Sequence, residues 1–512
     1  MTHSAPRRAL LGLLALALVC APFYGAWRYD EFRRSVTAQE DPPGPGPGGG
    51  PAAGAPAAGG GPGTAPVVLA YHDIARGSDS RYTVTPEAFD AQLAALAAAG
   101  YRTLSSEEFI AYLRGGPAPG PRSVFLTFDD GSHGLWVHAD RILARYRMRA
   151  AAFLITRSVG SHRPYYLSWE EIGRMARSGR WDFEDHTRDL HRREAVDAAG
   201  NTSSALTGRL WLPGEGRRET AQEYGRRIER DLDRSIGDLT RHGLPRPRLF
   251  AYPFSESRGH AAALPAGRML RAALAERFET ALTNNSDRPL PAGRRAAAAG
   301  EVQRVEVTAA TGTRDLLAAV EQWRSVSPAE CPAPLTEPRR WRRGDRSGDG
   351  LGEFTGSGPY PGRTGYAAAS YRPTGSADWS DYTVVARVGG LREAQNNAGV
   401  IVRDGSLVPL EVSLSHSYVR LREHRDGRWR ETGRRTLTDA AEHRITITVT
   451  GDRTVVTVDG GKRIERAAGA PGGDAAGGIA LSVRNGGPAG GWPRFTSLTV
   501  RPASGKAASS QR

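Results

Sequence analysis

Short apolar runs alternate with helical segments over residues 66–327. Residues 67–70, 123–128 and 150–155 are almost wholly apolar, which is typical of strands buried on both faces of a parallel sheet. Between such runs, apolar residues recur at helical spacing behind helix-capping residues such as Thr85. This alternation predicts an α/β domain with a largely parallel sheet, folded as a distorted (β/α) barrel.

The pattern changes over residues 345–503, where short strands are separated by Gly-rich turns. In residues 444–450, for example, Ile445, Ile447 and Val449 alternate with polar residues, which indicates a half-buried strand. Several such runs predict an all-β sandwich of the jelly-roll type.

Residues 9–27 are nearly continuously apolar and follow two arginines. At about 1.5 Å per residue, such a helix is about 28 Å long and matches the hydrocarbon core of a membrane. It predicts a signal anchor with residues 1–8 in the cytoplasm and a single-pass chain whose other domains lie outside. The alternative is a cleaved signal peptide and a secreted protein, but Pro22 and the bulky Tyr24 make both candidate cleavage sites poor.

Three further segments are predicted to connect the domains or to end the chain. Residues 28–65 are dominated by Pro, Gly and Ala and read as a spacer. Residues 328–344 form a second linker between the two domains, and residues 504–512 form a disordered tail.

Composition narrows the range of partners. The chain has 512 residues and a net charge of +14, and of its 69 basic residues only Lys462 and Lys506 are lysines. The arginines are scattered through every segment, which argues against a nucleic-acid reader, because those proteins cluster their basic residues on one face. A basic surface still suits anionic polymers of the cell envelope. With only Cys20 and Cys331, the sequence excludes a disulfide framework and a thiolate zinc cluster.

Two adjacent carboxylates end a predicted strand. Asp129 and Asp130 follow residues 123–128, and catalytic groups in barrels lie at the carboxyl ends of strands. Adjacent residues of a strand point to opposite sides, so the pair can take two roles only if the chain turns there, which Gly131 permits. Taken alone, the pair favours a simple strand-to-helix turn.

Two histidines change that balance. His186 and His191 follow a short segment that ends in acidic residues. On a helix, residues five apart point about 140° apart and could not chelate one ion, whereas in a loop they can. Two imidazoles and one carboxylate make an open three-ligand site for Zn²⁺ or a similar divalent metal. Surface histidines are the commoner explanation of any single pair.

Two more strand ends carry candidate groups. Residues 249–254 run from an apolar strand into a turn fixed by Pro253, which can aim a backbone N–H at a reaction centre. His72 follows the strand at residues 67–70.

Together these motifs resemble the polysaccharide deacetylase family (NodB homology, carbohydrate esterase family 4). Residues 127–131 resemble its first motif and residues 186–191 its second. The histidine spacing, with residues 71–73 and 251–254, is most similar to the branch that deacetylates poly-N-acetylglucosamine. The resemblance covers residues 66–327, while residues 345–503 resemble concanavalin-like or laminin-G-like sandwiches.

The resemblance implies a role for each residue. Asp129 would be the general base, and Asp130, His186 and His191 would bind a divalent metal, Zn²⁺ first and Co²⁺ or Ni²⁺ as substitutes. The backbone N–H near Phe254 would help to hold the oxyanion.

This sequence departs from the family at two places. Many members carry an arginine, which orients the base, where Ala251 stands here, and many carry a late histidine that acts as the general acid. No histidine lies between His260 and His416. The sequence therefore leaves two candidates for the proton donor: His72, and Asp129 acting first as base and then as acid. A purely structural role for His72 is the alternative interpretation of that residue.

The expected function is removal of N-acetyl groups from an N-acetylhexosamine polymer of the envelope or biofilm matrix. Peptidoglycan, chitin oligomers or acetylated xylan are alternative substrates. A second class of function is a non-catalytic surface glycan-binding protein with a retired site, in which the sandwich binds through Trp379, Trp429 or Trp492. The complete set of ligands and base favours the enzyme.

Overall fold

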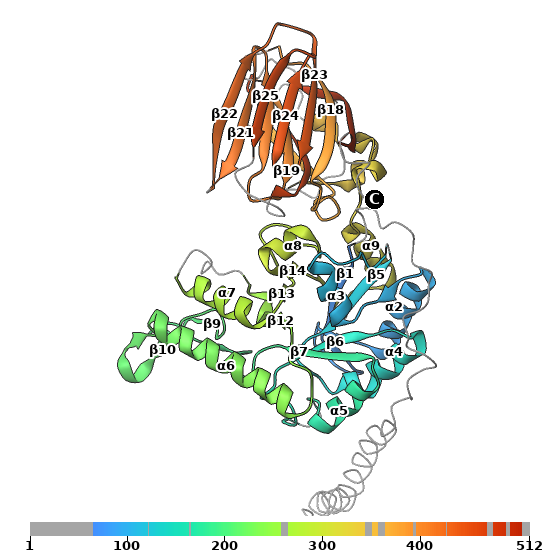
Figure 1. Ribbon diagram of the computed structural model, residues 1–512, viewed down its shortest axis with the longest axis vertical. Coiled ribbons are helices and arrows are strands. Elements are labelled where there is room, and N and C mark those ends of the chain that lie inside the picture. Colours follow the sequence, from blue (N-terminus) through green and yellow to red (C-terminus); the bar gives the residue numbers. More distant parts are fainter. Residues whose placement is uncertain are drawn as a thin grey trace, which may run out of the picture.

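The computed structural model describes residues 65–503, except 121, 163–164, 258–264, 344–350, 357–363, 393–395, 426, 468–474 and 488–491. Figure 1 shows two parts, a helix-covered parallel sheet and an antiparallel β-sandwich that stands beside it. The fold class predicted from the sequence, a (β/α) barrel followed by an all-β module, is confirmed.

The first part is built on a nearly closed parallel sheet. Its strands lie in the order β14 (Glu301–Gln303), β13 (Thr280–Thr283), β12 (Leu249–Ala251), β7 (Trp181–Asp185), β6 (Ala150–Leu154), β5 (Ser123–Phe128), β1 (Val67–Tyr71) and β15 (Val305–Glu306), with β4 (Arg102–Thr103) beside β5. The two end strands, β14 and β15, are consecutive in the chain, and Arg304 alone separates them. The chain therefore bridges the gap in the barrel at this one residue.

Helices cover the outside of this sheet (Figure 1). They are α2 (Pro86–Ala98), α3 (Ser106–Leu113), α4 (Asp140–Tyr146), α5 (Trp169–Arg177), α6 (Ala221–Arg241), α7 (Pro265–Arg277), α8 (Arg294–Ala299) and α9 (Thr313–Trp323). Several begin where the sequence predicts. Thr85 accepts from the Ala88 N–H at the start of α2, and Ser105 and Ser168 close capping boxes on α3 and α5.

Three short strand pairs extend from the barrel, of which the first is parallel and the other two are antiparallel. They are β2 (Asp73–Ile74) with β3 (Thr83–Val84), β8 (Arg193–Ala195) with β9 (Thr202–Ser204), and β10 (Trp211–Leu212) with β11 (Arg217–Arg218). The last two pairs lie between β7 and α6, directly after the segment that carries His186 and His191.

The second part consists of two facing antiparallel sheets. One sheet has the order β16 (Trp341–Arg343), β17 (Gly365–Tyr371), β26 (Gly478–Asn485), β19 (Asn397–Asp404), β20 (Leu410–Ser415), β21 (Tyr418–Arg425) and β22 (Arg428–Thr436). The other has the order β25 (Lys462–Ala467), β24 (Arg453–Val458), β23 (Glu442–Thr450), β18 (Asp381–Gly389) and β27 (Arg494–Pro502), and the short helix α10 (Gly352–Thr355) packs nearby. Alternate residues such as Ile445 and Ile447 are fully buried between the sheets, as their spacing predicts.

The tryptophans of the sandwich divide between core and surface. Trp379 and Trp492 are buried, and the Trp379 indole N–H donates to the Val326 carbonyl at 2.7 Å. Trp429 is 39% exposed, so of these three it alone presents a large aromatic surface to a ligand.

Polar contacts join the two parts at α8. The Asp378 carboxylate, from the sandwich, accepts the N–H groups of Arg294 and Arg295 at 3.1 and 2.9 Å. The Arg295 side chain is fully buried and donates to the Asp404 and Ala476 carbonyls of the sandwich at 2.8 and 3.0 Å. The sandwich thus caps and anchors the helix that leads into β14 and Arg304.

Among the described residues, no helix is both long enough and apolar enough to cross a membrane. The predicted anchor at residues 9–27 lies outside the described residues, as do the spacer at residues 28–64 and the tail at residues 504–512.

Removal of the Asp378 cap should weaken the whole chain. In Asp378→Ala, two backbone N–H groups lose their acceptor, so we expect the free energy of unfolding to fall by about 1–3 kcal/mol. The measurement is urea denaturation. Asp439→Ala, at a side chain that is 83% exposed, is the control and should change stability by less than about 0.5 kcal/mol. Equal stability of the two variants would contradict the anchoring role.

Candidate active site

The strand ends of the barrel bring the predicted groups together. Asp129 and Asp130 follow β5, and His186 follows β7. The backbone of Asp130 is left-handed, with φ of 72°, and Gly131 continues the turn with φ of 79°. The turn therefore begins at Asp130 itself and lets the two neighbouring carboxylates point in different directions.

Asp130, His186 and His191 gather their ligand atoms in one small space. The Nε2 atoms of His186 and His191 lie 3.5 and 3.4 Å from Oδ1 of Asp130, and one ligand atom of each residue lies within 4.8 Å of the others. That Oδ1 atom is buried without a hydrogen-bond partner. A buried, unpartnered carboxylate oxygen facing two imidazole nitrogens fits a divalent metal that takes nitrogen and oxygen ligands.

The surroundings of His186 prepare it to bind through one nitrogen. Its Nδ1 atom lies 2.8 Å from the Ala251 carbonyl, so in the neutral ring Nδ1 carries the proton and Nε2 has a lone pair for a ligand. Burial and the neighbouring His186 lower the pKa of His191 to about 4, despite the opposing effect of Asp130, so His191 is neutral at neutral pH. Burial alone would lower the pKa of His186, but Asp129 and Asp130 outweigh it and raise that pKa, so a metal would have to displace a proton from its Nε2.

A buried arginine holds the other carboxylate. Arg304 donates from its two terminal nitrogens to the two oxygens of Asp129, each at 2.7 Å, and its side chain is 0% exposed. Its Nε donates to Asn284 Oδ1 at 2.8 Å. Burial alone would raise the pKa of Asp129, but Arg304, His186 and His72 outweigh it and hold that pKa below its ordinary value. Asp129 is therefore a fixed anion.

Arg304 is the functional residue that the sequence reasoning missed. The absence of an arginine at Ala251 suggested that the base had lost its partner, yet Arg304 supplies one from the closure of the barrel. The signal was a lone basic residue between Val302 and Val305. Arg304 lies at the junction of two strands that pair at opposite ends of the sheet.

His72 lies beside the base at the end of β1. Its Nε2 is 4.0 Å from Oδ2 of Asp129, and its ring packs on Tyr82 with centroids 4.7 Å apart. Its Nδ1 is buried without a hydrogen-bond partner. The histidine is thus not pinned to the backbone through Nδ1, unlike the structural alternative weighed from the sequence.

Phe254 lies against His191, one of the candidate metal ligands. Its backbone is left-handed, with φ of 58°, and its ring centroid is 4.6 Å from that of His191. The ring is 42% exposed, and the Arg193 guanidinium lies over it at 5.3 Å. A left-handed phenylalanine is strained, and strain of this kind is concentrated at functional sites.

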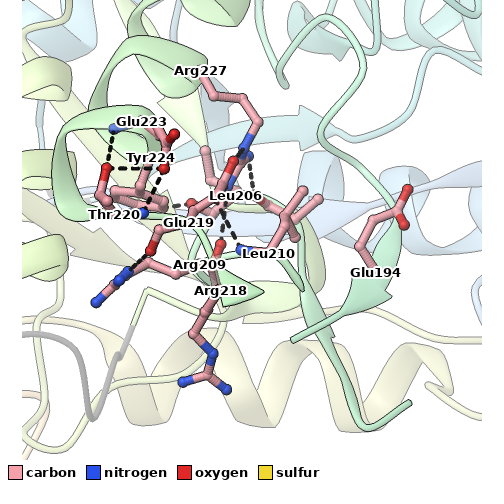
Figure 2. Close-up of polar contacts among 12 residues, drawn as sticks. Glu194, Leu206, Arg209, Leu210, Arg218, Glu219, Thr220, Glu223, Tyr224 and Arg227 are labelled. Atoms are coloured by element: carbon pink, nitrogen blue, oxygen red, sulfur yellow. Dashed lines mark hydrogen bonds and ion pairs between the residues drawn. The ribbon is translucent and has the colours of Figure 1, made fainter. Parts of the chain in front are cut away.

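The segment between His191 and α6 is held against that helix by a polar cluster (Figure 2). The buried Glu219 carboxylate accepts from the Leu210 N–H at 2.9 Å and from Arg227 Nε at 2.7 Å. Arg227 also donates to the Ala205 and Gly208 carbonyls at 2.6 and 3.0 Å. This cluster fixes residues 205–210 against α6.

The turn that carries the histidines is itself well supported. The Thr187 N–H donates to Asp185 Oδ1 at 2.8 Å, and its hydroxyl accepts from the Leu190 N–H at 3.2 Å. Asp189 pairs with Arg157 and Arg192. Thr187 and Asp189 therefore both stabilise the turn.

Two imidazoles and two carboxylates thus gather near the strand ends of a parallel (β/α) barrel, and three of these side chains could hold a metal ion. Residues 116–265 match the family model described as Polysaccharide deacetylase. The chain therefore contains a polysaccharide deacetylase domain, which confirms the resemblance drawn from its motifs.

Named relatives are similar to parts of this chain. A poly-beta-1,6-N-acetyl-D-glucosamine N-deacetylase of Staphylococcus epidermidis is 32% identical over 176 residues, which are 34% of this chain and 54% of the relative. The chain thus matches about half the length of that relative. IcaB from Ammonifex degensii is 28% identical with a TM-score of 0.39, covering 51% of this chain and 98% of that one. A de-N-acetylase from Aggregatibacter actinomycetemcomitans is 19% identical with a TM-score of 0.42, covering 49% and 98%.

The Arg304–Asp129 pair can be tested by a double-mutant cycle. Arg304→Leu leaves a buried carboxylate without its counter-charge, so we expect a loss of about 3–5 kcal/mol in unfolding free energy. Asp129→Asn in the same chain removes the stranded charge and should recover part of that loss. Denaturant unfolding of the wild type, both single variants and the double variant measures the coupling. Strictly additive losses would show that the two residues do not depend on each other.

Proposed function

We propose that this protein is a metal-dependent hydrolase that removes N-acetyl groups from an N-acetylhexosamine polymer of the cell envelope or biofilm matrix. The observation that carries the proposal is the convergence of Asp130, His186 and His191 beside a fixed Asp129. The named relatives that deacetylate poly-β-1,6-N-acetylglucosamine support this polymer as the substrate.

Asp130, His186 and His191 would hold the metal, with Zn²⁺ as the first candidate and Co²⁺ or Ni²⁺ as substitutes. When bound, such a metal polarises an amide carbonyl and lowers the pKa of water. The residues of the chain supply the rest of the reaction.

Asp129 takes the proton from the attacking water. Arg304 keeps the carboxylate ionised and fixes its direction, so little reorganisation is needed during the reaction. As the tetrahedral intermediate forms, the Phe254 N–H would donate to the oxygen that gains negative charge. The left-handed turn at Phe254 favours this orientation of the backbone.

Collapse of the intermediate breaks the C–N bond and requires a proton for the leaving amine. We assign this step to His72, because its Nε2 lies 4.0 Å from the Asp129 carboxylate and its Nδ1 has no hydrogen bond to the backbone. Asp129 returning the proton it took is the second candidate, since a carboxylate with a lowered pKa gives up a proton readily.

The proposal also places the enzyme outside the cytoplasm, where its substrate lies, with residues 9–27 as the membrane anchor. A cleaved leader would make the same enzyme a secreted one. The pairing of Arg304 with Asp129 supports the enzyme over the rival proposal, a retired domain that only binds glycan, because the base keeps an arginine partner although Ala251 stands at the family's arginine position.

Acetate release tests the activity and its ligand set. With a β-1,6-linked N-acetylglucosamine oligomer and Zn²⁺, we expect the full chain to release acetate and a chelator to abolish the release. Asp130→Ala should lower the rate by more than about a hundredfold, because loss of a residue that only hydrogen-bonds to a metal ligand already costs about 10–100-fold. Asp439→Ala, at a side chain of the sandwich that is 83% exposed, is the control and should keep the wild-type rate. Activity that survives both chelation and Asp130→Ala would contradict the metal mechanism.

The role of His72 can be separated from that of Asp129 by substitution. If His72 donates the proton, His72→Gln should lower kcat by about 10²–10⁴-fold with little change in KM. A nearly normal kcat in His72→Gln would assign the proton to Asp129 instead.

A further inference from the structure

Asn284 is the first residue after β13 and lies beside the arginine that holds the base. Its Oδ1 accepts from Arg304 Nε at 2.8 Å, and its Nδ2 donates to Glu306 Oε1 at 3.0 Å. These partners fix which way the amide points, because a guanidinium only donates and an ionised carboxylate only accepts. Asn284 therefore bridges a cation and an anion of the segment that closes the barrel.

The bond to Asn284 completes the fixing of the Arg304 guanidinium. Both terminal nitrogens donate to Asp129, and one of them also donates to Thr127 Oγ1 at 3.2 Å. Nε has no hydrogen bond to the base and donates to Asn284 instead. Because the guanidinium is planar and rigid, an acceptor at Nε sets the plane in which its other two nitrogens meet Asp129.

The backbone of the same residue reaches the turn that carries Phe254. The Asn284 N–H donates to Ser255 Oγ at 3.2 Å, and the Thr283 hydroxyl donates to the Ser255 carbonyl at 3.2 Å. Phe254 and Ser255 are both left-handed, with φ of 58° and 54°. Two consecutive residues of this kind are strained and persist only where their surroundings hold them. Asn284 thus lies between the arginine of the base and the turn of the oxyanion donor.

A role confined to its own loop does not explain the side chain of Asn284. Asparagines in turns usually bond the backbone of nearby residues. Here Thr283 has that role, because its hydroxyl accepts from the Asn285 N–H at 3.2 Å. Both side-chain bonds of Asn284 go instead to charged groups 20 and 22 residues further along the chain.

The charges around Asn284 are already balanced. Arg304 pairs with Asp129, and Glu306 accepts from Arg81 at 2.8 Å. The Arg81 side chain is 66% exposed, so its pair with Glu306 contributes little to stability. The neutral amide of Asn284 therefore adds direction to this set of charges and no charge of its own.

We propose that Asn284 is a positioning residue for the deacetylation, which holds the base through Arg304 and the oxyanion turn through Ser255. The inference rests on the proposed function, since it gives Asn284 a part in that reaction. Asn284 has no hydrogen bond to a candidate metal ligand among the described residues. It acts on the rate through geometry, and a misplacement of about 1 Å can cost about a hundredfold.

Acetate release by the full chain with Zn²⁺ tests the proposal on a β-1,6-linked N-acetylglucosamine oligomer. Asn284→Ala should lower kcat by about 10–100-fold and change KM by less than about twofold, because it disturbs the base and leaves substrate binding intact. Asn285→Ala, at the exposed neighbour, is the matched control and should keep kcat within about twofold. Rates are given per bound Zn²⁺, so partial unfolding does not count as a lower kcat.

Three further variants separate the two arms. Arg304→Lys keeps the charge but loses the Nε–H that Asn284 accepts, so adding Asn284→Ala to it should cost less than about threefold. Asn284→Asp with Glu306→Gln restores an acceptor for Arg304 and a donor beside it, and should bring kcat to within about fivefold of the wild type. Ser255→Ala removes the acceptor of the Asn284 N–H and should lower kcat by about three- to tenfold.

A second readout needs no activity. The Arg304 side chain is fully buried, so its Nε–H should give a slowly exchanging ¹H–¹⁵N signal, which is assigned by its loss in Arg304→Lys. Asn284→Ala removes the acceptor and should shift this signal and speed its hydrogen exchange by about tenfold or more. Asn285→Ala should leave the signal unchanged.

The inference and the proposed function fail in different ways. If the wild type releases no acetate, the proposed function is wrong, and the Arg304 signal still decides whether Asn284 holds the guanidinium. The positioning role is overturned if the wild type is active and Asn284→Ala keeps a normal kcat, or if Asn285→Ala loses as much. It is also overturned if the Arg304 signal does not respond to Asn284→Ala, or if Asn284→Ala costs the same with Arg304→Lys as without it.

Discussion

The buried ion pair between Arg304 and Asp129 is the interaction on which the rest of this site depends. A carboxylate at a barrel centre is costly to ionise, and Arg304 offsets that cost with two hydrogen bonds of 2.7 Å. Arg304 can reach Asp129 only because β14 and β15 pair at opposite ends of one sheet, and the chain crosses between them at this residue. The residue that bridges the two end strands of the barrel is therefore also the residue that orients the base.

This dependence reaches into the second domain. Asp378 of the sandwich caps α8, and α8 leads through Gly300 into β14 and Arg304. The sandwich thus supports the segment that carries the arginine, in addition to any ligand that it binds. The two domains share a buried polar junction at Arg295, where three backbone carbonyls accept from one guanidinium.

Much of the fold could be predicted because local signals agreed with the tertiary structure. Thr85, Ser105 and Ser168 cap helices where their patterns indicate, and the alternation of residues 444–450 marks a strand. The grouping of Asp130 with two histidines also followed from the motifs.

The role of Arg304 did not follow from the motifs. Its partner Asp129 lies 175 residues away in the sequence, and only the order of the strands in the sheet brings the two residues together. Nor could the sequence reveal the contacts of Asn284, since Arg304 and Glu306 lie 20 and 22 residues away from it. The most direct measurement of the central claim follows acetate release from a β-1,6-N-acetylglucosamine oligomer as metal-free protein is titrated with Zn²⁺. Activity should rise in proportion to bound metal and level off at one ion per chain. Release that is independent of metal content, or no release at full occupancy, would contradict a metal-dependent deacetylase.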